Sequence, residues 1–258
     1  MNREHPAVTA SDILSKVPQA TLAFWIIKIL ATTVGETGGD ALSMTLDLGY
    51  AVSTLIFLGF FCVTLAAQIT SKRYHPVFYW AVVVATTTVG TTTSDYLDRT
   101  LGLGYIKSSA MLFAGVLLVL GAWRSTTGEI AVDRITTRTN EIFYWVTILV
   151  SNTLGTALGD FVASTTGLGF ERGALIFAAL LLLVAGAYFL LKIPESVAFW
   201  AAYVLTRPLG ATLGDTLTKP HDEGGLALGR ITSSLVMVAA MIILIALTSR
   251  REQMEARS

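Results

Sequence analysis

The sequence is short of charge, cysteine and histidine. Charged residues make up 14% of its 258 residues and 53% are hydrophobic, with a mean hydropathy of +0.64. About a quarter of residues are charged in an ordinary soluble domain, so the chain is too apolar for that class. The lone Cys62 excludes an intramolecular disulfide and any site with several thiolate ligands. His5, His75 and His221 all lie outside the apolar segments, which excludes an imidazole cluster within a membrane. The formal net charge of zero gives no reason to expect nucleic acid as a partner.

Most of the sequence consists of long apolar segments. A spanning helix needs about 20 mostly apolar residues, and eight segments meet this length: 21–42, 50–70, 77–97, 104–123, 141–163, 169–191, 196–217 and 228–248. The fold expected is an all-α integral membrane protein with eight transmembrane helices. Loops on the side of both termini hold eleven Lys and Arg residues and those on the other side hold five, which predicts cytoplasmic termini.

One pattern occurs four times, in alternate apolar segments. A Trp is followed at position ten by Gly, at position fourteen by Gly or Ser, and at position fifteen by Asp, counting from the Trp. The four pairs are Trp25 and Asp40, Trp80 and Asp95, Trp145 and Asp160, and Trp200 and Asp215. Four acids at equivalent depth in a membrane are too costly to be incidental.

The pattern predicts four helical hairpins of parallel topology within one membrane domain. Their expected bounds are 20–71, 72–123, 140–192 and 193–249, with tails 1–19 and 250–258 and a polar linker at 124–139. A short turn containing Leu, Gly and an aromatic residue joins the helices of the first three hairpins, at 48–50, 103–105 and 168–170.

Positions eight, eleven, twelve and fifteen fall on one helical face. They hold Thr33, Glu36, Thr37 and Asp40 in the first copy, Thr88, Thr91, Thr92 and Asp95 in the second, Thr153, Thr156, Ala157 and Asp160 in the third, and Pro208, Ala211, Thr212 and Asp215 in the fourth. A stripe of this kind is expected to point inward, away from lipid. The four aspartates would then converge on one axis.

Converging carboxylates need a bound cation or shared protons, because like charges cannot all remain ionised in a small space. A site of carboxylate and hydroxyl oxygens suits hard divalent cations such as Mg²⁺, Ca²⁺ or Mn²⁺. The predicted metal ligands are Asp40, Asp95, Asp160, Asp215 and Glu36. The same aspartates also fit a structural role in tying down turns or bonding between helices. Arg207 and Lys28 lie at membrane depth as well, and each fits either a structural or a functional role.

The four Trp-to-Asp hairpins resemble a family of bacterial membrane proteins with four tandem two-helix repeats, each with one tryptophan, which is catalogued as of unknown function. The resemblance covers about residues 20–248. It implies eight helices in a bacterial inner membrane, and it implies no substrate.

The leading functional prediction is a transporter of a divalent metal cation, with the threonines of the stripe and Arg207 along the path, and with efflux and coupling to protons left open. A proton-coupled carrier of a small organic solute or anion and a membrane scaffold or sensor are the alternatives. No catalytic residue pair or cofactor motif lies at membrane depth, so an enzyme is not expected and no cofactor is predicted beyond a cation as substrate. The expected partners are the lipid bilayer and the transported ion or solute, and association with further copies of the chain is left open.

Overall fold

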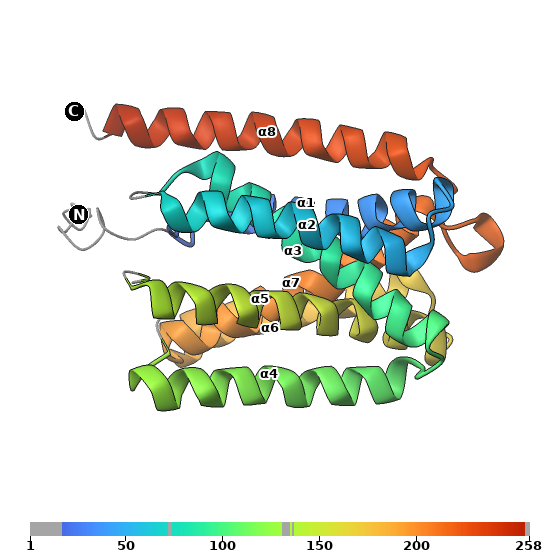
Figure 1. Cartoon of the computed structure of the whole chain (residues 1–258), viewed down its shortest axis with the longest axis horizontal. Coiled ribbons are helices and arrows are strands. Elements are labelled where there is room, and N and C mark those ends of the chain that lie inside the picture. Colours follow the sequence, from blue (N-terminus) through green and yellow to red (C-terminus); the bar gives the residue numbers. More distant parts are fainter. Residues whose placement is uncertain (1–16, 72–73, 131–134, 136, 256–258) are drawn as a thin grey trace.

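The structure, a computed structural model, describes residues 17–71, 74–130, 135 and 137–255 (Figure 1). Every regular element within these residues is helical. The α-helices are α1 Leu22–Asp40, α2 Gly49–Thr70, α3 Pro76–Asp95, α4 Tyr105–Thr127, α5 Arg138–Asp160, α6 Phe170–Gly186, α7 Glu195–Thr218 and α8 Arg230–Glu255. The start of α1 and the end of α8 lie at the same end of the bundle, here called the terminal end. The inner helices α1, α3, α5 and α7 finish at the opposite end, here called the aspartate end.

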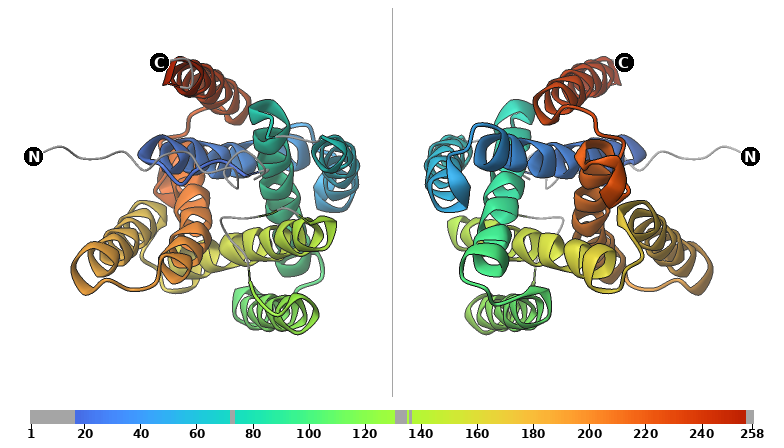
Figure 2. Two further views of the ribbon diagram at one scale, coloured as in Figure 1. Left: turned by 90° about the vertical axis from the view of Figure 1, so that its left-hand side faces the viewer. Right: turned by 90° about the vertical axis from the view of Figure 1, so that its right-hand side faces the viewer.

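The four helices that carry the repeated pattern form a closed ring. Helix α1 packs on α3, α3 on α5, α5 on α7 and α7 on α1. Figure 2 shows the ring end-on, with each of the four helices crossing its two neighbours at an angle. Their polar residues are buried while the outer helices expose apolar side chains. Each inner helix therefore has its polar side chains inside the protein.

The outer helices connect each repeat to the next. Helix α2 packs on α3, α4 on α5, α6 on α7, and α8 returns to α1. The two helices of one repeat, by contrast, make little contact with each other. The turn after each inner helix carries the chain outward and across to the neighbouring repeat, so the two helices of each predicted hairpin are consecutive in sequence and pack on other repeats. No single repeat can bury its own inner helix.

Five helices are long and apolar enough to cross a membrane by length and composition: α2, α4, α5, α6 and α8, with α5 and α6 counted through the π-helical turns that follow them. The chain is thus a helical membrane protein with internal repeats. The inner helices α1, α3 and α7 do not meet that criterion among the described residues, since threonines and charges replace apolar residues on their buried faces. Their passage through the membrane therefore remains a prediction.

A π-helical turn follows the repeated aspartate in three of the four copies. It spans Ala41–Thr45 after α1, Tyr96–Thr100 after α3 and Phe161–Thr165 after α5. Such turns are rare and occur often at functional sites. The fourth copy stays α-helical to Thr218 and then stops, because Pro220 forces Lys219 into an extended conformation.

The joining turns contain glycines with a left-handed backbone. The Gly of each Leu-Gly-aromatic turn has a positive φ, 72° at Gly49, 73° at Gly104 and 79° at Gly169. A residue with a Cβ atom adopts this conformation only at a cost, so the glycine lets the chain reverse directly into the outer helix.

The boundaries of the expected tails and linker differ from the observed helices. Helix α4 continues through Thr127 and α5 begins at Arg138, so helix occupies both ends of the predicted linker 124–139. Helix α8 runs on to Glu255, through most of the predicted tail 250–258. Residues 1–16, 131–134, 136 and 256–258 of these predicted segments lie outside the described residues.

Aromatic side chains close the terminal end of the ring. The residue before each Trp is aromatic and its ring lies near the Trp of the next repeat. The centroid separations are 5.6 Å for Phe24 and Trp80, 5.5 Å for Tyr79 and Trp145, 6.0 Å for Tyr144 and Trp200, and 5.7 Å for Phe199 and Trp25. The hydroxyls of Tyr79 and Tyr144 are also hydrogen-bonded at 2.9 Å. The repeated tryptophans are therefore packing residues within a fourfold aromatic layer.

Candidate functional site

The inner helices approach most closely at the glycine of position ten. A Cβ atom on Gly210 would lie 2.2 Å from Thr32 Oγ1 and 2.8 Å from the Thr32 carbonyl carbon. In each copy this glycine faces position seven of the next repeat: Gly35 faces Thr87, Gly90 faces Asn152, Gly155 faces Arg207 and Gly210 faces Thr32. Small residues at these points allow contact between helix backbones.

This contact directs every fourth residue of each inner helix to the axis. Positions seven, eleven and fifteen are all buried, and they form successive layers from the middle of the bundle to the aspartate end. Stripes of four-residue spacing follow the ridges that pack when helices cross at a substantial angle. The layers are Thr32, Thr87, Asn152 and Arg207; then Glu36, Thr91, Thr156 and Ala211; then Asp40, Asp95, Asp160 and Asp215.

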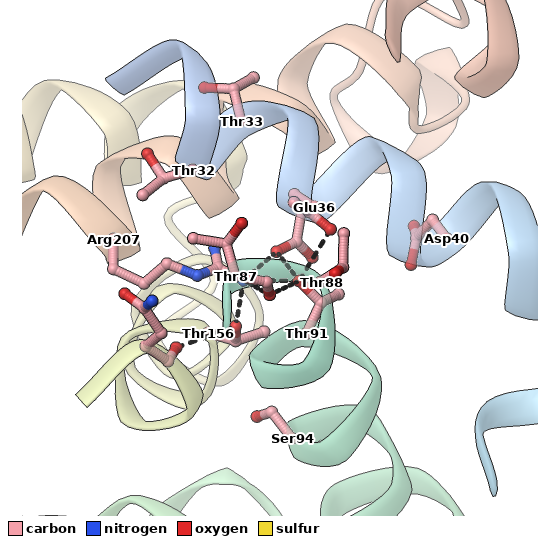
Figure 3. Close-up of polar contacts among 12 residues, drawn as sticks. Thr32, Thr33, Glu36, Asp40, Thr87, Thr88, Thr91, Ser94, Thr156 and Arg207 are labelled. Atoms are coloured by element: carbon pink, nitrogen blue, oxygen red, sulfur yellow. Dashed lines mark hydrogen bonds and ion pairs between the residues drawn. The ribbon is translucent and has the colours of Figure 1, made fainter. Parts of the chain in front are cut away.

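Positions eight and twelve of the predicted stripe do not join this axis. Thr37 Oγ1 is hydrogen-bonded to Ser234 Oγ of the outer helix α8 at 2.7 Å. Figure 3 shows Thr33 turned away from the group around Arg207. Each of the others donates its hydroxyl to a carbonyl of its own helix: Thr33, Thr88, Thr92, Thr153 and Thr212. The crossing of the helices brings positions seven and eleven to Arg207 instead, and the placement of these threonines on a transport path stays a prediction.

Arg207 joins all four inner helices at the centre of the ring (Figure 3). Its side chain is fully buried, and its Nη2 atom lies 3.1 Å from Glu36 Oε2 on α1. The same atom donates to Thr91 Oγ1 on α3 at 2.5 Å and to Thr156 Oγ1 on α5 at 2.6 Å. Thr91 in turn donates to Glu36 Oε2 at 3.2 Å. Glu36 and Arg207 thus form a buried ion pair supported by hydroxyls of the two other inner helices.

The aspartates are held by basic residues that follow the inner helices. Arg99 Nε lies 3.0 Å from Asp95 Oδ1 and its Nη2 lies 3.7 Å from Asp160 Oδ2. Lys219 Nζ lies 3.3 Å from Asp215 Oδ1 and 3.4 Å from Asp40 Oδ2. Each cation therefore bridges the aspartate of its own repeat and that of the next one, and these two bridges are called the clamps below.

The Trp-to-Asp pattern occurs in all four repeats, whereas the clamp cations occur only in alternate repeats. Arg99 and Lys219 both occupy position nineteen, in the second and fourth repeats. The first and third repeats have Met44 and Ser164 there. Basic residues four positions after an Asp on a helix are a recognisable pairing signal in the sequence. This spacing does not reveal the second aspartate that each cation contacts, because that aspartate comes from another repeat.

Three carboxylates come close enough together to share one cation. One oxygen each from Glu36, Asp40 and Asp95 lies within 4.8 Å of the others, and all three residues are buried. Asp160 and Asp215 are not part of this group, although they lie in the same layer as Asp40 and Asp95. The structure therefore brings together three of the five predicted ligands.

Protein cations already neutralise much of this charge. Arg230 Nε lies 3.5 Å from Asp40 Oδ2, beside the Lys219 contact. Burial alone lowers the pKa of Lys219, but Asp215 and Asp40 outweigh it and raise that pKa above the ordinary value of a lysine. Five acids thus face four cations, Arg99, Arg207, Lys219 and Arg230. The site can accept a further cation, but only by competing with these side chains.

The fold and this axis define a helical membrane protein built from four internal repeats. Residues 23–74, 78–129, 143–193 and 198–254 match the family described as Repeat of Unknown Function (DUF347), and the chain belongs to that family. The resemblance inferred from the Trp-to-Asp hairpins is thereby confirmed. Comparisons with curated proteins and with solved structures returned no match.

Proposed function

We propose that the protein is a transporter of a hard divalent cation, which passes along the axis of the inner ring. The observation that carries the proposal is the group of Glu36, Asp40 and Asp95, three buried carboxylates with oxygens within 4.8 Å of one another. Oxygen ligands of this type favour Mg²⁺, Ca²⁺ or Mn²⁺. The proposed activity forms and breaks no covalent bond.

In this proposal the clamps hold the aspartate end closed. Arg99 and Arg230 are partly exposed, with side chains 31% and 21% accessible, so they lie between the aspartates and the solvent. A divalent cation reaching the ring would take over the carboxylates and release Arg99 and Lys219. Entry of the cation would thus be coupled to separation of the repeats that each clamp joins.

The opposite half of the axis is also closed, by the aromatic layer described above. The arrangement supports alternating access, in which only one end opens at a time. Pro208 directly follows Arg207 within α7 and removes one backbone hydrogen bond at the middle of the ring. A bend of α7 at this residue would move the fourth aspartate, Asp215, relative to the Glu36–Arg207 pair.

We place the protein in a bacterial inner membrane with both termini in the cytoplasm. Single cysteines introduced into a Cys62→Ser background test this orientation. A membrane-impermeant thiol reagent added to intact cells should label Asp47→Cys, in an exposed turn at the aspartate end, and spare Lys192→Cys, in an exposed turn at the terminal end. The reverse labelling pattern would invert the topology.

Metal-dependent stabilisation of the purified protein tests the cation site. At a hundredfold excess over its dissociation constant, a bound ion should raise the free energy of unfolding by about 2.7 kcal/mol. We expect one of Mn²⁺, Mg²⁺ and Ca²⁺ to do so, and Asp95→Asn and Asp40→Asn to abolish the effect. Lys219→Met should strengthen binding, because it removes a competing cation from the ring.

Asp222→Asn is the matched control, since Asp222 is an exposed acid near the same end of the bundle. It should leave the metal effect unchanged. Absence of a metal effect in folded wild-type protein would rule against the proposal. An effect that survives both Asp40→Asn and Asp95→Asn would do the same, because the ion would then bind elsewhere.

A further inference from the structure

A second charged group lies on the axis, nearer the aromatic layer. Lys28 is at position three of the first repeat and Arg207 is at position seven of the fourth, and both side chains are fully buried. Glu36 neutralises Arg207 through Nη2. Within the described residues no carboxylate forms an ion pair with Lys28, so this part of the axis has one more positive charge than negative.

The contacts of α1 with α7 place these two residues in successive layers of the ring. Lys28 Nζ lies over the ring of Tyr203, 4.1 Å from its centroid. One turn later, Thr32 Oγ1 donates to the carbonyl of Thr206 at 3.1 Å. Tyr203 and Arg207 are four residues, or about one turn, apart on the same face of α7. From there the Arg207 side chain extends to Glu36, Thr91 and Thr156 of the following layer. Positive charges in successive buried layers repel each other.

Three donors of this pair have no acceptor in the described part of the chain. They are Lys28 Nζ and the Nε and Nη1 atoms of Arg207. A buried cation without a partner costs several kcal/mol, which a cation–π contact only partly offsets. The aspartates cannot supply the missing acceptor, because they lie in the layer two turns beyond Arg207 and hold cations of their own.

We propose that Lys28 and Arg207 form a binding site for a small monovalent anion. An anion between them would accept from Lys28 Nζ and from the free edge of the guanidinium, and it would balance the excess charge. Val83 and Ile148 complete the layer of Lys28 and Tyr203 and are fully buried. A ligand in this layer would be enclosed by the four inner helices, which favours an anion of a few atoms. Chloride, nitrate and formate are ligands of that class. The site shares no carboxylate with the proposed cation site and does not depend on it.

The test is thermal unfolding of the purified protein in sodium gluconate, without divalent metal. Chloride, nitrate or formate replaces gluconate at constant ionic strength. We expect one of these anions to raise the Tm saturably, by about 5 °C or more at a hundredfold excess over its dissociation constant. In Lys28→Met the anion effect should disappear. The Tm in gluconate alone should rise, because an unpaired buried charge has been removed.

Lys107→Met is the control, because Lys107 is exposed at the start of α4. It should keep the full anion effect, which separates binding from a general influence of the salt on stability. Lys28→Gln serves if Lys28→Met does not fold. The proposal is overturned if wild type shows no saturable shift, or if the shift persists in the Lys28 variant. It is also overturned if the shift is lost only in Arg99→Met, which would place the anion at the clamps.

Discussion

Arg207→Met should lower the free energy of unfolding by about 3–5 kcal/mol, the usual cost of removing one partner from a buried ion pair. Among the described residues, the substitution leaves the Glu36 carboxylate in the centre of the ring with only the Thr91 hydroxyl as donor. It also removes the donor that links Thr156 of α5 to this group. Unfolding in mixed detergent micelles, followed by circular dichroism, measures the change.

The double variant Arg207→Met with Glu36→Gln separates the pair from its surroundings. Replacing both charges removes the unpaired acid, so most of the lost stability should return. Arg172→Met is the control, because Arg172 is exposed on the outer helix α6, and its effect should stay within about 0.5 kcal/mol. A double variant no more stable than Arg207→Met alone would contradict the assignment of Glu36 as the partner.

Gly210→Ala should destabilise the protein by about 2 kcal/mol, because overpacking a tight contact typically costs 1–3 kcal/mol. The added methyl group would lie 2.8 Å from the carbonyl carbon of Thr32, which is backbone and cannot rotate aside. Helices α1 and α7 must then separate, which weakens the Thr32 to Thr206 hydrogen bond and opens the ring. The same unfolding assay measures the loss.

Gly59→Ala is the matched control, since a Cβ atom on Gly59 in the outer helix α2 has no neighbour within 4 Å. There the higher helix propensity of alanine acts alone and should stabilise the protein by up to about 1 kcal/mol. The effect of Gly→Ala on the free energy of unfolding should therefore have opposite signs in the inner and the outer helix. Equal effects at the two positions would mean that the close approach of α1 and α7 is not required.

The closed ring also explains why the two helices of one sequence repeat do not pack on each other. Each outer helix covers the inner helix of the following repeat, and α8 completes the circle on α1. Because every repeat relies on its neighbour, stability is shared around the ring, as in other repeat proteins that close on themselves. Buried charge at the centre is tolerated because four helices supply its partners.

Much of this architecture could be predicted from local residue patterns. The spacing of Trp25 and Asp40 and its three recurrences define the repeats, because equal spacing puts equivalent side chains at equal depth on each helix. The apolar outer helices follow from hydropathy alone. The small residues at positions ten and fourteen are of the kind that lets membrane helices approach closely, as Gly210 does against Thr32.

The tertiary structure alone decided which residues meet. Periodicity places Glu36 and Thr37 on the same face of α1 and does not specify which of them points to the axis. The crossing of the helices directs Glu36 to Arg207 and Thr37 to α8. The partners of Arg99 and Lys219 likewise come from neighbouring repeats. Short-range spacing determines the face on which a side chain lies, whereas the geometry of packing between distant helices determines what it touches.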